Sequence, residues 1–345
     1  MRSLLMKELI HLQKIIYPDL LETMENRYTV LNSIYLFEPI GRRGVIDHTH
    51  LPERLIRNEI QLLQTQRLID VTTKGMFITD EGKNIINRLH EFIRELSGLT
   101  ALENELQQKT GIKDLIIVAG NSDKDPLIKQ ALGRAAVQFL KKTVTSDVTI
   151  AVTGGTTMAA VANAMVPFDD VTCLFVPARG GVGEKVENQA NTIVAQMAKA
   201  EKGDYALLHV PDPLSETLYQ SMIQEPSIKE KLQRIKNAHI VLHGIGEALT
   251  MAKRRKTPSQ IITKLTQEKA VSEAFGYYFN EKGDIVHKVR TIGIQLEDLE
   301  NVHRVVTVAG GTSKAQAIAS FMKQKKSDVL IIDEAAATIL NDQLL

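Results

Sequence analysis

Short apolar runs rich in Val, Ile and Leu alternate with stretches of helical periodicity over most of the chain. Most of these runs are apolar on both faces, and 10–18 residues of helical pattern follow them. A strand that is apolar on both faces is buried on both, as in a parallel sheet covered by helices. The sequence therefore predicts an α/β domain with a parallel sheet over residues 110–345. The runs are 115–120, 148–155, 171–181, 205–211, 239–246, 304–311 and 328–334.

The chain before residue 110 has a different pattern, in which helical periodicity dominates and glycine is scarce. Since 345 residues comfortably hold two domains, we expect a first domain over residues 1–97. A long helix over about 80–108, loosened at Gly98, is expected to link it to the second domain. Its apolar stripe has coiled-coil spacing, so the helix either packs on its own domain or forms a dimer seam. The stripe consists of Ile85, Leu89, Phe92, Leu96, Leu99 and Leu106.

The sequence argues against a disulfide-bonded, a metal-binding and a membrane-spanning protein. Cys173 is the only cysteine and lies in an apolar run, so it is expected to be buried and no intrachain disulfide is possible. No metal site is predicted. No run reaches the roughly 18 uninterrupted apolar residues of a membrane span. Residues 2–16 have the spacing of an amphipathic helix rather than of a signal peptide, and the expected location is therefore the cytoplasm.

Three predicted helices and a hairpin follow one another in the first domain. The stretches 27–40 and 45–48 precede a helix over 51–66, in which Pro52 stands at an early position that tolerates proline. Alternating apolar and polar residues around Lys74 and the glycine after it predict a β-hairpin. This order of helices, glycine-containing turn and hairpin is typical of a winged helix-turn-helix domain.

The polar face of the helix 51–66 carries Arg54, Arg57 and Asn58. Arginine and asparagine side chains make paired hydrogen bonds to guanine and adenine edges in the major groove. Lys74 at the hairpin tip is placed to contact a phosphate. Residues 1–97 hold 13 Lys and Arg against 13 Asp and Glu, so DNA binding has to come from this local patch. The alternatives are a solvated helix face and a protein–protein contact.

Two predicted strand-to-helix junctions are alike, 152–157 (VTGGTT) and 308–314 (VAGGTSK). Each ends an apolar run with paired glycines and continues with hydroxyl side chains at the start of a helix. Glycine lets backbone N–H groups turn toward an anion, and the helix terminus adds partial positive charge. Because parallel strands open at one edge of their sheet, the two loops predict a ligand with two phosphates, or with one phosphate and another anion. The alternative is that both loops are plain turns.

Polar side chains near other predicted strand ends are further candidates for ligand contacts. Arg179 follows a strand and is flanked by glycines, and Asn188 and Gln189 are suited to bind sugar hydroxyls. Arg254 and Glu273 lie at similar edges. Arg255, by contrast, is expected to be a solvated surface residue.

With these residues placed, the whole chain resembles the SorC/DeoR-type bacterial transcriptional regulators, and most closely a branch that controls glycolytic genes. The resemblance rests on EPIGRRG, LPERLIRNEIQLL, GMFITDEG, VTGGTT, PARGG and VAGGTSKAQAI, in this order. It implies a winged helix-turn-helix reader fused to a Rossmann-like sugar-binding domain. That domain is similar in fold to ribose-phosphate isomerases and glucosamine-phosphate deaminases.

The resemblance also implies a repressor that needs no cofactor and whose effector is fructose-1,6-bisphosphate. Its target would be double-stranded operator DNA upstream of the glyceraldehyde-phosphate dehydrogenase operon, bound by a homodimer or by a tetramer. The sugar bisphosphate would loosen this assembly and relieve repression. The implied ligand-binding residues are Gly155, Thr156, Thr157, Arg179, Gln189, Arg254, Glu273 and Lys314.

A sugar-phosphate isomerase or deaminase is the rival class of function. The related deaminases carry Asp-Gly-His after Gly-Ile-Gly, whereas Gly246 here is followed by Glu-Ala-Leu. Isomerisation needs a base with a shifted pKa near the sugar carbonyl. Glu273, Glu247 and His243 are the sensible candidates, and none has a second acid at a recognisable spacing. His209 and His243 are expected to be structural, and we predict no catalytic residues.

Overall fold

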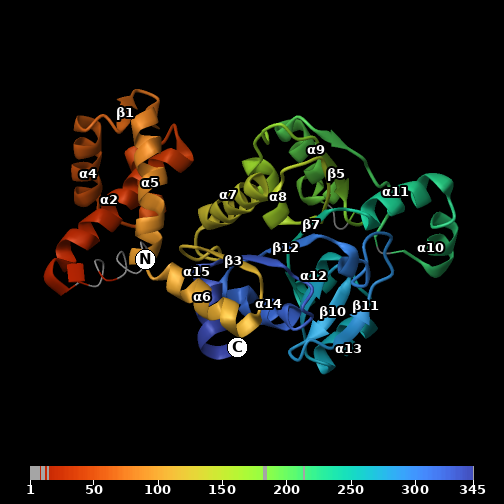
Figure 1. Cartoon of the computed structure of the whole chain (residues 1–345). Coiled ribbons are helices and arrows are strands. Elements are labelled where there is room, and N and C mark those ends of the chain that lie inside the picture. Colours follow the sequence, from red (N-terminus) through yellow and green to blue (C-terminus); the bar gives the residue numbers. More distant parts are fainter. Residues whose placement is uncertain (1–7, 9–11, 14, 182–184, 213, 345) are drawn as a thin grey trace. The chain divides into compact units, whose positions relative to one another are not determined.

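The computed structural model of the chain describes residues 8, 12–13, 15–181, 185–212 and 214–344. The predicted N-terminal helix 2–16 lies mostly outside the described residues. The chain divides into two compact units, Met1–Ala101 and Leu102–Leu345, and each is described by itself (Figure 1). None of the described helices is long and apolar enough to cross a membrane.

The N-terminal unit has the helix and strand order of a winged helix-turn-helix domain, as predicted (Figure 1). Its core gathers the apolar faces of the helices, and Val30, Ile34, Ile56 and Leu63 are among the fully buried side chains. The two strands form an antiparallel hairpin. The elements are α2 (Pro18–Phe37), α3 (Arg42–Thr49), α4 (Glu53–Thr65), β1 (Ile69–Thr72), β2 (Gly75–Ile78) and α5 (Asp80–Leu96).

The predicted long helix over 80–108 is wrong in one respect, because the structure has two helices there. α5 ends at Leu96, and α6 (Leu99–Thr110) begins after Gly98, whose φ of +78° a helix interior does not accommodate. Leu96 packs against Leu21 of the same unit, and Ile85 packs against the core of that unit. These side chains of the stripe therefore pack on their own domain, which is one of the two alternatives that the spacing left open.

The C-terminal unit contains the predicted parallel sheet, which has seven strands among the described residues. The strand order is β3-β13-β12-β7-β4-β5-β6, and every neighbouring pair is parallel. The central strands are buried on both faces, as their apolar sequence requires. The strands are β3 (Asp114–Val118), β4 (Val148–Val152), β5 (Cys173–Pro177), β6 (Asp204–Tyr205), β7 (Ile240–His243), β12 (Arg304–Val308) and β13 (Val329–Asp333).

Helices follow most of these strands and pack on the sheet. Cys173 and Phe175 of β5 and Met158 of α8 share one buried cluster with side chains of α7 and α9. The helices of this unit are α7 (Pro126–Thr143), α8 (Thr156–Ala164), α9 (Ala190–Glu201), α10 (Glu216–Met222), α11 (Pro226–Lys236), α12 (Ala248–Arg254), α13 (Ser259–Gln267), α14 (Ala315–Met322) and α15 (Glu334–Ile339).

A second, antiparallel sheet lies between β7 and β12 along the chain, and the sequence pattern did not predict it. Its order is β11-β10-β9-β8, and α12 and α13 contribute to its small core around Tyr278 and Leu265 (Figure 1). Its strands are β8 (Gly246–Glu247), β9 (Ala270–Ala274), β10 (Tyr277–Asn280) and β11 (Ile285–Lys288). This sheet matters for function because β9 carries Glu273.

Candidate DNA-reading helix and effector cavity

α4 presents one polar face to solvent and buries the other. Ile56 and Leu63 are fully buried, whereas Arg54, Arg57 and Asn58 are exposed. Arg57 donates to the Glu53 carboxylate one turn earlier, at 3.2 Å. Among the residues that the structure describes, Arg54 and Asn58 make no side-chain hydrogen bond or ion pair. Their donors are therefore available to a partner, as base-reading side chains have to be.

Two polar contacts hold the hairpin and α4 on the same scaffold. Arg27 of α2 donates from Nε to Glu59 of α4 at 2.6 Å. The Glu38 carboxylate, just after α2, accepts the backbone N–H of Ile78 at 2.7 Å. The hairpin that carries the exposed Lys74 and the polar face of α4 are thus both anchored to α2.

Arg42 and Arg43 belong to the first turn of α3, so this helix starts three residues before the predicted stretch 45–48. Both are exposed, and Arg42 lies 3.8 Å from Glu53. The glycine at position 41, whose backbone is extended, is the N-terminal cap of α3. Two further basic side chains therefore lie on the surface of the winged helix-turn-helix domain.

A cavity of about 800 Å³ opens at the carboxyl ends of β4, β7 and β12 in the C-terminal unit. This is the edge at which parallel α/β sheets bind ligands. Of the described residues that line it, seven are basic and two are acidic. Such a surplus of positive charge favours an anionic ligand. The charged residues are Arg179, Lys185, Lys253, Arg254, Arg255, Lys256, Lys314, Glu247 and Glu273.

The first glycine loop, 154–157, is open to this cavity. Gly155 has a φ of +119°, and a Cβ atom placed on it would meet nothing within 4 Å. Its N–H donates to the carbonyl of Asn188 at 2.8 Å, which orients the loop. α8 begins at Thr156, so its first-turn N–H groups have no partner within the helix. Thr156 is exposed and Thr157 is buried, and both line the cavity.

The second glycine loop, 310–314, differs from the predicted open cradle, because carboxylates of the chain occupy it. The N–H of Gly311 donates to Asp333 at 2.7 Å. The N–H of Ser313 donates to Asp123 at 2.8 Å, and its hydroxyl donates to the same carboxylate at 2.9 Å. A Cβ atom on Gly311 would stand 2.3 Å from Asp123. Of this loop, Ser313 and Lys314 line the cavity.

Lys129, a residue that sequence reasoning missed, brings another positive charge to the open loop. Its Nζ lies 3.5 Å from Thr156 Oγ1. Burial, together with the charges of Lys129 and Arg254, lowers the pKa of Lys314 to about 8. No motif marks Lys129 in the sequence, because it sits within the regular helix α7.

Arg179 and Glu273 meet in a buried network of charges at the cavity wall. Arg179 donates to Asp212, at 2.8 Å from Nε, and to Glu273 at 3.3 Å. Glu273 Oε1 also accepts from Arg255 at 2.6 Å and from the N–H of Gly276 at 2.7 Å. Burial disfavours the Glu273 carboxylate, but the Arg255 and Arg179 charges outweigh that effect and hold its pKa below the usual value.

Two corrections follow from this network. Arg255 is not a solvated surface residue, since only 6% of it is exposed and its guanidinium binds Glu273 and Tyr278. Asp212, which the sequence did not single out, is the main partner of Arg179. The hydrogen bonds that tie Glu273 all reach Oε1. Oε2 lies 3.4 Å from where a Cβ atom on Gly246, a residue of the cavity lining, would stand.

Gln189 is not among the described residues that line the cavity, although Asn188 and Ala190 are. Its side chain instead lies near Gly181, where a Cβ atom would come within 3.5 Å of Oε1. The structure thus brings together Gly155, Thr156, Thr157, Arg179, Arg254, Glu273 and Lys314, and leaves Gln189 beside this group.

The residues considered for acid–base chemistry are engaged in structural roles or lie elsewhere. His243 is fully buried, burial lowers its pKa to about 4, and its Nε2 lies 2.7 Å from the Thr307 hydroxyl. Glu247 caps α12 by accepting the N–H groups of Leu249 and Thr250. His209 is exposed and is not part of the described lining. Among the residues that the structure describes, no cluster of His, Cys, Asp and Glu could hold a metal ion.

Two family models match the chain and together cover both units. The DNA-binding domain found at the N-terminus of CggR proteins matches residues 23–93. A sugar-binding domain matches residues 94–341. Both descriptions agree with the surfaces described above, an exposed polar helix in the first unit and a cavity in the second.

Curated relatives resemble the chain over nearly its full length. The central glycolytic genes regulator of Priestia megaterium is 50% identical over 96% of this chain and 98% of its own length. The protein of the same name from Bacillus subtilis is 48% identical over 98% of this chain and 100% of its own length.

Solved structures of SorC-type regulators have the same fold. One from Enterococcus faecalis is 45% identical, covers 69% of this chain and 98% of its own, and superposes with a TM-score of 0.66. The full-length sorbitol operon regulator of Klebsiella pneumoniae is 14% identical, with a TM-score of 0.67 over 88% of this chain and 94% of its own, and shows the fold alone.

The relatives reported above are transcriptional regulators, so the matches support a regulator over the isomerase or deaminase alternative. The chain belongs to the family of the central glycolytic genes regulators, SorC-type transcriptional regulators with an N-terminal DNA-binding domain and a C-terminal sugar-binding domain.

Proposed function

We propose that the protein is a cytoplasmic repressor of glycolytic genes whose operator binding is relieved by a phosphorylated sugar, with fructose-1,6-bisphosphate as the favoured effector. The observation that carries the proposal is the basic cavity at the carboxyl edge of the sheet, with one open glycine loop in its wall. The names of the two curated relatives support the choice of glycolytic genes as targets.

The geometry of the cavity suggests how a sugar phosphate would be held. One phosphate would accept from the first-turn N–H groups of α8 and from Thr156, and would be neutralised by Lys314. Since carboxylates fill the second glycine loop, a second phosphate would depend on basic side chains such as Arg254. Arg179 and the free oxygen of Glu273 would bind sugar hydroxyls. A role for Gln189 beside this set remains a prediction.

The proposed DNA contacts are Arg54, Arg57 and Asn58 on α4 and Lys74 on the hairpin. The exposed donors on α4 support base reading in the major groove, and the hairpin position supports a phosphate contact. A homodimer, or a tetramer on DNA, would match two half-sites of an operator.

Relief of repression requires that the effector bind one state of the protein better than another. We propose that ordering of the loops around Thr156 and Lys314 changes the surface through which sensor domains pair. Coupling of the usual size, about 1–3 kcal/mol, would lower operator affinity roughly five- to 150-fold. Equal stoichiometry on DNA with and without effector would contradict this mechanism.

The effector proposal is tested by isothermal titration with fructose-1,6-bisphosphate, using fructose-6-phosphate for comparison. We expect saturable binding of the bisphosphate, weaker binding of the monophosphate, and loss of binding in Lys314→Ala. Lys326→Ala, which removes a lysine that does not line the cavity, is the matched control. Absence of binding to the unaltered protein would remove the bisphosphate as effector.

The DNA proposal is tested by measuring operator affinity of Arg54→Ala and Arg57→Ala. Each variant is expected to lose specific binding, by about 1–3 kcal/mol or more, while its thermal unfolding stays unchanged because both side chains are exposed. Arg67→Ala, an exposed residue after α4, is the control. Unchanged affinity in both variants would show that α4 is not the reading helix.

A further inference from the structure

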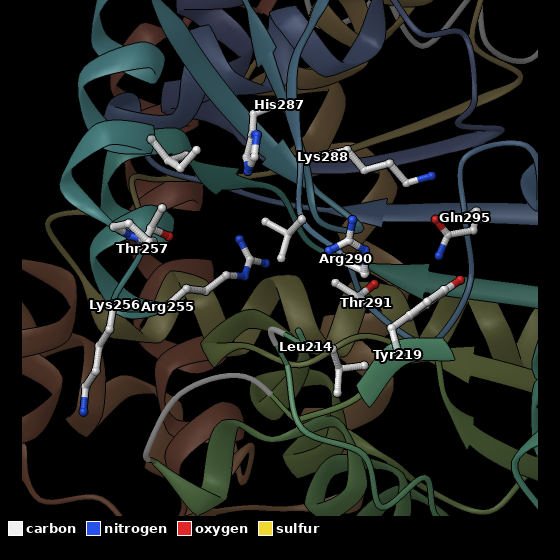
Figure 2. Close-up of a pocket in the computed structure, with 13 residues that line it drawn as sticks. Leu214, Tyr219, Arg255, Lys256, Thr257, His287, Lys288, Arg290, Thr291 and Gln295 are labelled. Carbon is white, nitrogen blue, oxygen red and sulfur yellow. The ribbon is translucent and has the colours of Figure 1, made fainter. Parts of the chain in front are cut away.

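The C-terminal unit contains a second cavity, of about 500 Å³, beside β11 and the start of α13 (Figure 2). Its lining includes Arg255, Lys256, His287, Lys288 and Arg290, and none of the described residues that line it is acidic. A space of this size admits a small molecule, and the charge of its wall favours an anion.

Arg255 lines this cavity, and its Nε donor is unused. Its two terminal nitrogens donate to Tyr278 at 2.8 Å and to Glu273 at 2.6 Å. Its Nε is buried and has no hydrogen-bond partner among the described residues. Figure 2 shows the Arg255 side chain extending toward the middle of the cavity, with His287 directed toward the same space. Because buried donors are normally satisfied, this nitrogen points to an acceptor supplied by a ligand.

The rest of the wall is largely apolar. Leu214, Tyr219, Pro258, Ile261 and Val289 make up most of it, and the remaining residues are Thr257, Thr291 and Gln295. A sugar, with hydroxyl groups on every side, would leave many of them unpaired against such a wall. A compact molecule with one anionic group and an apolar body fits better.

Two of the basic groups, Arg255 and Arg290, are already paired with carboxylates, and Lys288 lies over an aromatic ring. Arg290 lies 2.5 Å from Glu216, and the Lys288 ammonium lies 4.7 Å from the centre of the Tyr277 ring. The cavity therefore does not offer the concentrated charge that a bisphosphate needs, which separates it from the effector cavity. A single anionic group is the better match.

We infer that this cavity is a second ligand site, which takes a small organic monoanion with an apolar body and binds its carboxylate or phosphate through Arg255 Nε. Arg255 also lines the effector cavity and holds Glu273 there. Occupancy of the second site therefore changes effector affinity without blocking it. This last part rests on the proposed function, whereas the existence of the site does not.

The test uses the full-length protein with 4-fluorobenzoate and 4-fluorophenyl phosphate as probes, observed by fluorine NMR, and 4-fluorobenzyl alcohol as the neutral comparison. We expect saturable binding of at least one anionic probe and none of the alcohol. The probe that binds more tightly identifies the anionic group. Ile261→Trp, which fills the cavity, should weaken binding about tenfold or more.

Ile285→Trp is the matched control, because Ile285 is 52% exposed on β11 and does not line the cavity. Thermal unfolding checks that both variants are folded. Equal probe binding in the two variants, absence of binding of both anions, or full displacement of the probe by fructose-1,6-bisphosphate would each overturn the site.

Titration of fructose-1,6-bisphosphate with and without saturating probe tests the coupling. A several-fold change in effector affinity is expected in the unaltered protein, and no change in Ile261→Trp. If the bisphosphate does not bind while the probe does, the proposed effector fails and the second site stands.

Discussion

The two glycine loops at the carboxyl edge of the sheet have nearly the same sequence, but one is open and carboxylates of the chain occupy the other. The loop 154–157 is open, and a side chain added at Gly155 would meet only space. The loop 310–314 has its N–H groups bound by Asp123 and Asp333. The difference arises in a third segment, the turn before α7, which brings Asp123 against the second loop. A phosphate-binding motif therefore predicts the ability to bind an anion, but its surroundings decide which anion it binds.

The comparison also bears on the effector. If both glycine loops were open, backbone N–H groups alone could bind the two phosphates of a bisphosphate. With one cradle filled, selectivity for two phosphates has to come from side-chain charges, among them those of Arg254 and Lys314 in the cavity wall. Charge at these positions can be changed by mutation or pH, which makes the proposal testable.

The largest effect on effector binding is expected from placing a carboxylate in the open loop, because carboxylates already fill the second loop. Thr156→Asp places a carboxylate at the first position of α8, where it repels a ligand phosphate. We expect effector affinity to fall about 100-fold or more, which is ~3 kcal/mol. Stability should be unchanged or raised by about 0.3–1 kcal/mol, because an acidic group suits a helix N-terminus.

Isothermal titration and thermal unfolding measure both quantities for Thr156→Asp, and Thr156→Ser is the control. Effector binding that survives the aspartate would mean that the phosphate does not sit at this loop.

A smaller effect is expected from Lys129, whose ammonium lies beside Thr156 of the open loop. Lys129→Ala should weaken effector binding about tenfold, as expected for one charge-assisted contact to phosphate. Lys142→Ala, at the exposed end of the same helix, should bind normally. Titration of the two variants side by side decides whether Lys129 belongs to the site.

The pH dependence of binding follows from Lys314, whose pKa is lowered to about 8. A lysine is charged below its pKa, so effector affinity should be steady near pH 7 and fall as pH rises through 8. By pH 9 the loss should approach about tenfold if binding requires the charged form.

Lys314→Arg keeps its charge over this range and should bind with little change between pH 7 and pH 9. Titrations at three pH values compare the two proteins. A fall of equal size in both would assign the pH dependence to another group.

The smallest effect is expected from removing one of the two carboxylates that fill the second loop, which leaves Asp333 bound to Gly311. Asp123→Ala removes acceptors from Ser313 and Thr312, and because Asp123 is exposed the loss should be about 0.5–1.5 kcal/mol of unfolding free energy. Burial opposes the Asp123 carboxylate, but the Ser313 and Thr312 hydrogen bonds outweigh it and lower its pKa. Its contribution is therefore present at neutral pH and lost as pH falls through the acidic range.

Urea unfolding at pH 7 and at pH 3 measures the difference between Asp123→Ala and the unaltered protein, which should shrink at the lower pH. The N–H and hydroxyl of Ser313, which Asp123 no longer occupies, should then bind inorganic phosphate and gain stability from it. Lys124→Ala, at the adjacent exposed position, should show neither effect. If phosphate does not raise the stability of Asp123→Ala, the loop is not an anion-binding site.

Much of the fold could be predicted from the pattern of apolar residues. The strands around Ile117, Ile150 and Leu242 are apolar on both faces, and only a sheet covered on both sides buries such segments. The antiparallel sheet 246–288 was missed, because its strands are short and include polar residues such as Glu273 and His287. The break at Gly98 was only half predicted, since a glycine can loosen a helix or end it.

The sequence by itself determined the two domains, the parallel sheet, the exposed face of α4 and both glycine loops, because these depend on local spacing and on where apolar residues must be buried. Only the tertiary structure decided that one loop is filled, that Arg255 is buried against Glu273, that Asp212 binds Arg179, and that Lys129 lies beside Thr156. Each of these contacts joins residues far apart along the chain. Their distance and burial depend on how the elements pack, which no short stretch of sequence records.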